Sequence, residues 1–186
     1  MSVLFDLDYD AAWFVPLPHD AEAREGWIRD AVDRVQGAES ADAASESALH
    51  AAVEALTDLA DQGAVQFWFA PAGVFTDLLV TIDVADVGAI PEGPFQDSRE
   101  STATGVAPLL TERHGGGYLV RRTEAVASAA EPVLVAQWSA VVNDGRHVIL
   151  VDAIGSTLPA FAFYEVQLPR LIDGIMIESE SVVVAR

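Results

Sequence analysis

Three carboxylates alternate along the first ten residues of the chain, at Asp6, Asp8 and Asp10. In an extended strand, side chains two residues apart point to the same side, so these carboxylates would share one face. Carboxylates gathered in this way can hold a divalent cation or exchange protons with a substrate. They can also keep an exposed sheet edge soluble, which is the interpretation that we favour.

The segment VLFDLD, residues 3–8, resembles the first motif of the haloacid-dehalogenase-type phosphatases, a strand that ends in Asp-x-Asp. The resemblance implies that Asp6 attacks phosphorus and that Asp8 acts as acid and base, with magnesium between them. That family also uses a basic side chain, typically lysine, and this chain contains no lysine. A metal-dependent hydrolase that uses Asp6 and Asp8 is therefore the alternative function, not the favoured one.

The same acids match the first three ligand positions of a calcium-binding EF-hand loop. Ala11, however, stands where that loop needs glycine, and Leu17 where it needs a bidentate glutamate. Cysteine is absent, which excludes disulfides and thiolate metal sites. No pair of histidines has the spacing of a metal site; the four are His19, His50, His114 and His147. We therefore expect no metal and no cofactor.

Composition narrows the class of protein. The formal net charge of −19 repels nucleic acid and anionic membranes, so we expect neither as a partner. A hydrophobic fraction of 51% over 186 residues predicts one folded domain, residues 1–186. No apolar run approaches the roughly 20 residues of a membrane helix. The acidic start, MSVLFDLDYD, lacks the basic residues of a signal peptide, so we expect a cytoplasmic protein.

Hydrophobic periodicity predicts two helices first. Asp20 suits an N-cap, and apolar residues at helical spacing predict a helix over about 21–36. A second amphipathic helix covers Leu49 to Ala60, and residues 38–47 are either a linker or its first turns. After Gly63 the period changes to two, which predicts strands. These are 65–69, 74–84, 102–112 and 118–124, with a loop over 86–101 and a turn at 114–117.

The stretch 132–155 predicts a long hairpin whose turn contains Asp144 and Gly145. With a two-residue loop there, Trp138 lies on an apolar face with Val151, and Gln137 faces Asp152 on the other face. A three-residue loop would change this register. In the preferred register Ser139 lies opposite Leu150, away from His147, so no Ser139–His147–Asp152 triad forms and we expect no catalytic residues.

Gln137 and Asp152 are open to two interpretations. They are either a hydrogen-bonded pair at the margin of a helix-covered sheet or the floor of a groove that binds a small molecule or a peptide. We therefore regard one set of residues as the possible binding face: Gln137, Ser139, Asp152 and Trp138.

After the hairpin, residues 161–167 fit either a strand or a helical turn. Pro169 suits the first position of a helix that runs to about Ser179, and residues 182–184 could add an edge strand. The order of elements predicts an α+β fold. We expect an antiparallel sheet of five to six strands, with two N-terminal helices and one C-terminal helix packed on it.

The C-terminal half resembles the PsbP-like fold group, which includes photosystem accessory proteins and a Ran-binding relative. The resemblance rests on the segments 117–122, 133–142, 144–145, 147–153 and 171–175. It implies a binding or accessory domain without catalysis, and it assigns a role to no residue. The two consecutive helices before the first clear strand depart from the usual pattern of the group.

These observations favour a non-enzymatic domain that binds another protein or associates with itself. Four tryptophans and an apolar sheet could supply the anchors for such a partner. The alternatives are a small-ligand-binding protein that uses the Gln137 and Asp152 face, and the hydrolase described above.

Overall fold

The computed structural model describes residues 3–36, 43–59, 64–71, 74–87, 103–127 and 132–177. The fold is α+β, as predicted. Its elements are β1 (Phe5–Leu7), β2 (Phe14–Pro16), α1 (Ala21–Gln36), α2 (Ala43–Asp58), β3 (Val65–Phe69), β4 (Leu79–Asp86), β5 (Ala103–Thr111), β6 (Gly115–Val126), β7 (Val133–Asn143), β8 (His147–Gly155), α3 (Leu158–Asp173) and β9 (Ile175–Ile177).

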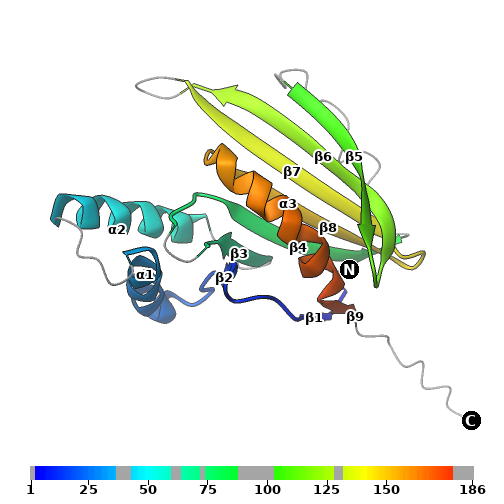
Figure 1. Ribbon diagram of the computed structural model, residues 1–186. Helices are drawn as coiled ribbons and strands as arrows, with labels where there is room; N and C mark the ends of the chain where they lie inside the picture. Colours follow the sequence, from blue (N-terminus) through cyan, green and yellow to red (C-terminus); the bar gives the residue numbers. More distant parts are fainter. Residues whose placement is uncertain are drawn as a thin grey trace, which may run out of the picture.

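Seven strands form one antiparallel sheet in the order β2-β3-β4-β8-β7-β6-β5 (Figure 1). The six strands predicted from the sequence are all present, and the short β2 adds a seventh beside β3. β1 lies outside this sheet and pairs with β9, so that Phe5 is opposite Ile177. The two ends of the described chain therefore meet beside the C-terminal end of α3.

α3 covers one face of the sheet, which we call the α3 face (Figure 1). Alternate residues of the central strands bury their side chains there, because successive strand residues point to opposite faces. They pack with the aromatic and aliphatic side chains of the helix into one core. Its members include Ala136, Ala140 and Val142 of β7, Ile149, Val151 and Ala153 of β8, and Phe161, Tyr164, Leu168 and Ile172 of α3.

The other two helices pack against the opposite face at the β2-β3-β4 end of the sheet. Their second core surrounds Trp68, whose side chain is fully buried and whose indole Nε1 donates to the Thr76 carbonyl at 2.7 Å. α1 has its predicted bounds, and the Asp20 carboxylate accepts the Glu22 N–H as an N-cap does. α2 already begins at Ala43, and the rest of the possible linker, up to residue 42, lies outside the described residues.

The prediction that the last helix begins at Pro169 is wrong. α3 begins at Leu158, resolves the ambiguous segment 161–167 as helix and carries Pro169 in its interior. Pro159 occupies the first turn, where the missing N–H has no partner within the helix, so it is the proline that marks the start. The predicted end at Ser179 and the possible strand at 182–184 lie outside the described residues.

The predicted register of the β7–β8 hairpin is also wrong. Asn143 lies opposite Val148 rather than Arg146, because the Asp144 carboxylate accepts the N–H groups of Arg146 and His147 and closes a wider loop. The shift amounts to two residues, so each face keeps its predicted members while the cross-strand partners change. Gln137 is therefore opposite Ile154, and it does not face Asp152.

The other predicted turn, around the glycines at 115–117, does form a hairpin. Its bend is formed by residues 112–114, followed by Gly115 at a φ of 79°, a conformation that favours glycine. The predicted loop over 86–101 lies outside the described residues from 88 onward, and β4 begins at Leu79 rather than Val74. Among the helices of the described residues, none is long and apolar enough to cross a membrane.

Candidate functional site

In the part of the chain that the structure describes, no helix covers the face opposite α3 over β5, β6, β7 and β8, and we call this region the open face (Figure 1). Its centre is buried nevertheless, because Val120 and Ser139 are each only 9% exposed. Three large apolar side chains on it are strongly exposed: Val106 at 65%, Leu110 at 78% and Tyr118 at 63%. Exposed apolar patches on a folded protein often mark interaction sites. The cross-strand register places further side chains beside them, namely Pro108, Val120, Arg122, Gln137, Ser139, Val141, Leu150 and Asp152.

A row of polar side chains crosses the open face at its centre. Ser139 lies opposite Asp152, Asp152 opposite Thr81, and Thr81 opposite Gln66. The Ser139 hydroxyl donates to the Asp152 carboxylate, and the Gln66 amide donates to the Thr81 hydroxyl at 3.3 Å. Gln66 and Ser139 are buried, so Thr81 and Asp152 are the residues of this row that keep partial exposure toward a partner.

Burial raises the pKa of Asp152, and the negative charge of Asp83 raises it further. The hydrogen bond from Ser139 and the positive charge of Arg122 act in the opposite direction without cancelling the effect of burial. Asp152 is therefore a half-buried carboxyl group whose ionised form is disfavoured where it lies. This property makes it sensitive to anything that covers the open face.

The possible binding face predicted from the sequence divides between two surfaces. Gln137, Ser139 and Asp152 lie on the open face, while Trp138 lies on the α3 face. The Trp138 ring packs against Phe161 with a centroid separation of 5.0 Å, and the Arg121 guanidinium carbon lies 4.8 Å from its centroid. Trp138 therefore helps to hold α3 on the sheet instead of joining the other three residues.

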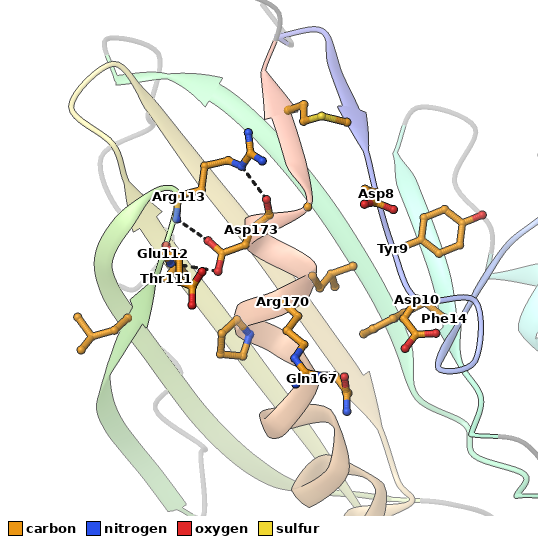
Figure 2. Close-up of a pocket in the computed structure, with 15 residues that line it drawn as sticks. Asp8, Tyr9, Asp10, Phe14, Thr111, Glu112, Arg113, Gln167, Arg170 and Asp173 are labelled. Atoms are coloured by element: carbon orange, nitrogen blue, oxygen red, sulfur yellow. Dashed lines mark hydrogen bonds between the residues drawn. The ribbon is translucent and has the colours of Figure 1, made fainter.

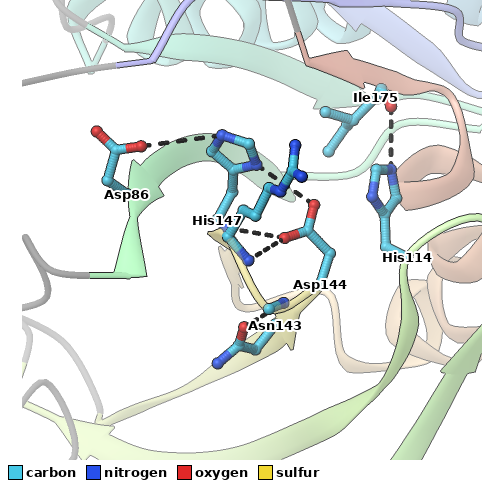
Figure 3. Close-up of polar contacts among 8 residues, drawn as sticks. Asp86, His114, Asn143, Asp144, His147 and Ile175 are labelled. Atoms are coloured by element: carbon cyan, nitrogen blue, oxygen red, sulfur yellow. Dashed lines mark hydrogen bonds and ion pairs between the residues drawn. The ribbon is translucent and has the colours of Figure 1, made fainter. Parts of the chain in front are cut away.

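The structure brings no Ser139–His147–Asp152 triad together. Ser139 and Asp152 do contact each other, contrary to the predicted register, but His147 is on the opposite face. Figure 3 shows His147 between Asp86 and Asp144, at nitrogen–oxygen distances of 3.8 and 3.4 Å. The group that contacts the Ser139 hydroxyl is therefore the Asp152 carboxylate, and the imidazole of a Ser-His-Asp triad does not lie beside it.

A second candidate site is a crevice of about 770 Å³ at the C-terminal end of α3, which sequence reasoning missed (Figure 2). Three distant segments form its walls: residues 8–14, the turn between β5 and β6, and the last turns of α3. Its polar lining residues are Asp8, Tyr9, Asp10, Thr111, Glu112, Arg113, Gln167, Arg170 and Asp173. Its volume lies within the range of small-molecule sites.

Asp173 fixes the shape of this crevice. Its carboxylate accepts the N–H groups of Glu112 and Arg113 at 3.0 and 2.7 Å, and its carbonyl accepts the Arg113 Nε at 2.9 Å (Figure 2). Close by, a ring nitrogen of the buried His114 lies 3.0 Å from the Ile175 carbonyl (Figure 3). These contacts hold the β5–β6 turn against the end of α3, so the contacts of Asp173 and His114 are structural.

The acids of the N-terminal segment do not converge. Asp6 lies on β1, where its carboxylate accepts the neighbouring Leu7 N–H, and only Asp8 and Asp10 line the crevice. In the part of the chain that the structure describes, no three His, Asp or Glu side chains form a group that could hold a metal ion.

Comparisons with known proteins add no identity. No family model, no curated protein and no solved structure matches the chain.

Proposed function

We propose that this chain is a non-enzymatic binding domain whose open face receives another protein. The observation that supports this proposal most is the exposure of Val106, Leu110 and Tyr118 on neighbouring strands. Side chains of this size gain free energy when a partner removes them from water, at roughly 25 cal/mol per Å² of apolar surface. Tyrosine in addition is enriched among the residues that contribute most to protein interfaces.

The shape and polarity of the open face favour a protein over a small molecule. A sheet face offers a broad surface, and its exposed apolar residues share the face with the half-buried Asp152 as in a mixed protein interface. The net charge of −19 favours a neutral or basic partner and disfavours nucleic acid and anionic membranes. A second copy of the chain is a poorer candidate, because two such acidic molecules repel each other.

The resemblance to PsbP-like domains agrees with this proposal. It rests on the sequence of the C-terminal half, the region that contains β6, β7, β8 and α3. Membership of that fold group is part of the proposal, and so is a cytoplasmic location. The resemblance to that group supports an accessory domain that works by binding.

Site-specific photo-crosslinking in the native host tests the proposal. A benzophenone amino acid replaces Tyr118 on the open face and, in a matched control, Phe163 on the outer side of α3, which is 58% exposed. We expect a crosslinked protein adduct from position 118 in clear excess over position 163. A second substitution, Val106→Asp, should remove the adduct at position 118 because it places a charge within the apolar patch.

Sedimentation velocity on the purified protein separates a second copy from a different partner. We expect the purified protein to sediment as a monomer over the accessible concentration range. The crosslinked adduct from position 118 should exceed the mass of one chain by the mass of the partner. Equal crosslinking at both positions, or none at position 118, would contradict the proposal. A symmetric adduct of two copies would replace the foreign partner with self-association.

A further inference from the structure

The crevice at the end of α3 holds charges of both signs that do not pair with one another. Asp8 and Asp10 lie on the segment that forms one wall, and Arg170 lies on α3, which forms another (Figure 2). Within the described residues, no hydrogen bond or ion pair engages the Arg170 guanidinium or the Asp8 carboxylate. The walls therefore hold these charges too far apart for direct contact, with a space between them.

Gln167 is the second observation that points to a ligand. It lines the crevice although only 8% of it is exposed, and its amide has no hydrogen bond to any other described residue. In Figure 2 its side chain extends from α3 toward the segment that carries Asp10. Gln167 lines the crevice, so a ligand there could bond to its amide, which can both donate and accept hydrogen bonds.

Asp173, Arg113 and Asp10 are already engaged, whereas the Glu112 carboxylate makes no hydrogen bond or ion pair with another described residue. The Asp173 carboxylate accepts the Arg113 backbone N–H, and the Arg113 Nε donates to the Asp173 carbonyl. One Asp10 carboxylate oxygen accepts the Ala12 N–H at 2.9 Å. This leaves Asp8, Glu112 and the second oxygen of Asp10 for a cation, and Arg170 for an anion. An anionic ligand alone would be repelled by the carboxylates, and a cationic ligand alone would leave Arg170 unused.

The crevice also has an apolar part, which includes Phe14, Leu171 and Met176. We propose that the crevice binds a zwitterionic small molecule of the α-amino acid class. The ligand carboxylate pairs with Arg170, its ammonium group lies between Asp8 and Asp10, and the Gln167 amide bonds to the carboxylate. An apolar ligand side chain packs on Pro169 and Met176, which line the crevice and keep part of their surface exposed. This site is independent of the open face and of its proposed partner.

Isothermal titration calorimetry with L-leucine, L-phenylalanine and L-methionine tests the proposal. We expect binding in the submillimolar range by at least one of them. For that amino acid, the N-acetyl derivative lacks the ammonium charge and the amide derivative lacks the carboxylate. Each derivative should bind at least ~10-fold more weakly, because each loses a charge-assisted hydrogen bond.

Two substitutions and one control connect the binding to the crevice. Arg170→Met and Gln167→Met should each weaken binding by ~10-fold or more while the circular dichroism spectrum stays unchanged. Arg146→Met, an equally exposed arginine at the β7–β8 turn, should bind as the unaltered protein does. The proposal is overturned if none of the three amino acids binds at millimolar concentration. Equal binding of the N-acetyl derivative, or undiminished binding by Arg170→Met, overturns it as well.

Discussion

Asp77 stabilises the start of α3 from a distant part of the chain, and its removal should destabilise the fold strongly. The N-cap residue of α3, Thr157, makes no capping hydrogen bond with its own side chain. Instead, the Asp77 carboxylate accepts the Ser156 N–H at 2.7 Å, the Ser156 hydroxyl at 2.5 Å and the Thr157 N–H at 2.7 Å. Asp77 lies just before β4, so it joins the sheet to the helix.

The expected magnitude follows from these three hydrogen bonds. A hydrogen bond to a charged group contributes about 1.5–3 kcal/mol, and partial exposure of Asp77 favours a smaller value, about 1 kcal/mol each. Asp77→Ala should therefore lower the free energy of unfolding by about 3 kcal/mol. For a chain of this size, that loss corresponds to a decrease in melting temperature of roughly 6–12 °C.

The pH dependence provides a second test of the same contact. Burial acts to raise the pKa of Asp77, but its hydrogen bonds with Ser156 and Thr157 outweigh this effect and hold the pKa below its ordinary value. The stability that Asp77 contributes is therefore complete above the unfolded-state pKa of about 3.9. It is lost as the pH falls through the lower pKa of the folded state.

Chemical denaturation of the unaltered protein and of Asp77→Ala, repeated between neutral and acidic pH, measures both effects. Asp33→Ala, which removes the same charge from an exposed position on α1, controls for the high negative charge of the chain. The control should change stability by no more than about 0.5 kcal/mol. If Asp77→Ala is no more destabilising than this control at neutral pH, the reasoning is refuted.

Three further predictions concern single positions. A Cβ on Gly174 would lie 1.8 Å from the Asp8 carbonyl oxygen, so Gly174→Ala should lower the free energy of unfolding by about 3 kcal/mol. The control substitution Gly26→Ala has open space around its Cβ and should not lower the free energy of unfolding. The fully buried Tyr164 hydroxyl has no hydrogen-bond partner among the described residues, so Tyr164→Phe should raise stability by about 1 kcal/mol in the same denaturation assay. Because burial raises the pKa of Asp152, Asp152→Asn should stabilise the fold increasingly as pH rises from below 4, levelling off once Asp152 ionises; a pH-independent difference would contradict this.

The sequence predicted those parts of the fold that depend on local pattern. A hydrophobic period of two predicted β3, apolar runs around a turn signal predicted both strands of the long hairpin, and helical apolar spacing predicted α1, because each pattern arises from local sequence. The register of the β7–β8 hairpin could not be read in the same way. It depends on how the Asp144 side chain bonds the loop, a choice that the residue types alone leave open.

The crevice could not be predicted because it belongs to no single segment. Its walls meet only after β1 pairs with β9 and Asp173 binds the β5–β6 turn. One signal did exist in the sequence: Gln167 is polar among residues at apolar helical spacing. The predicted helix began at Pro169, so Gln167 lay outside it and its polarity had no helical context. In the structure α3 begins at Leu158 and includes Gln167.

Carboxylates hold α3 at both of its ends, and this arrangement connects the two candidate sites. The Asp77 carboxylate accepts the N–H groups of Ser156 and Thr157, just before the first turn of α3. The Asp173 carboxylate, in the last turn of α3, accepts an N–H group of the β5–β6 turn. One helix fixed in this way fills the α3 face of the sheet and leaves the opposite face available to another molecule. The same fixed helix holds Gln167 and Arg170 opposite Asp8 and Asp10. The crevice therefore keeps its shape only while the sheet and α3 remain joined, so loosening the contact at Asp77 should weaken amino acid binding as well as stability.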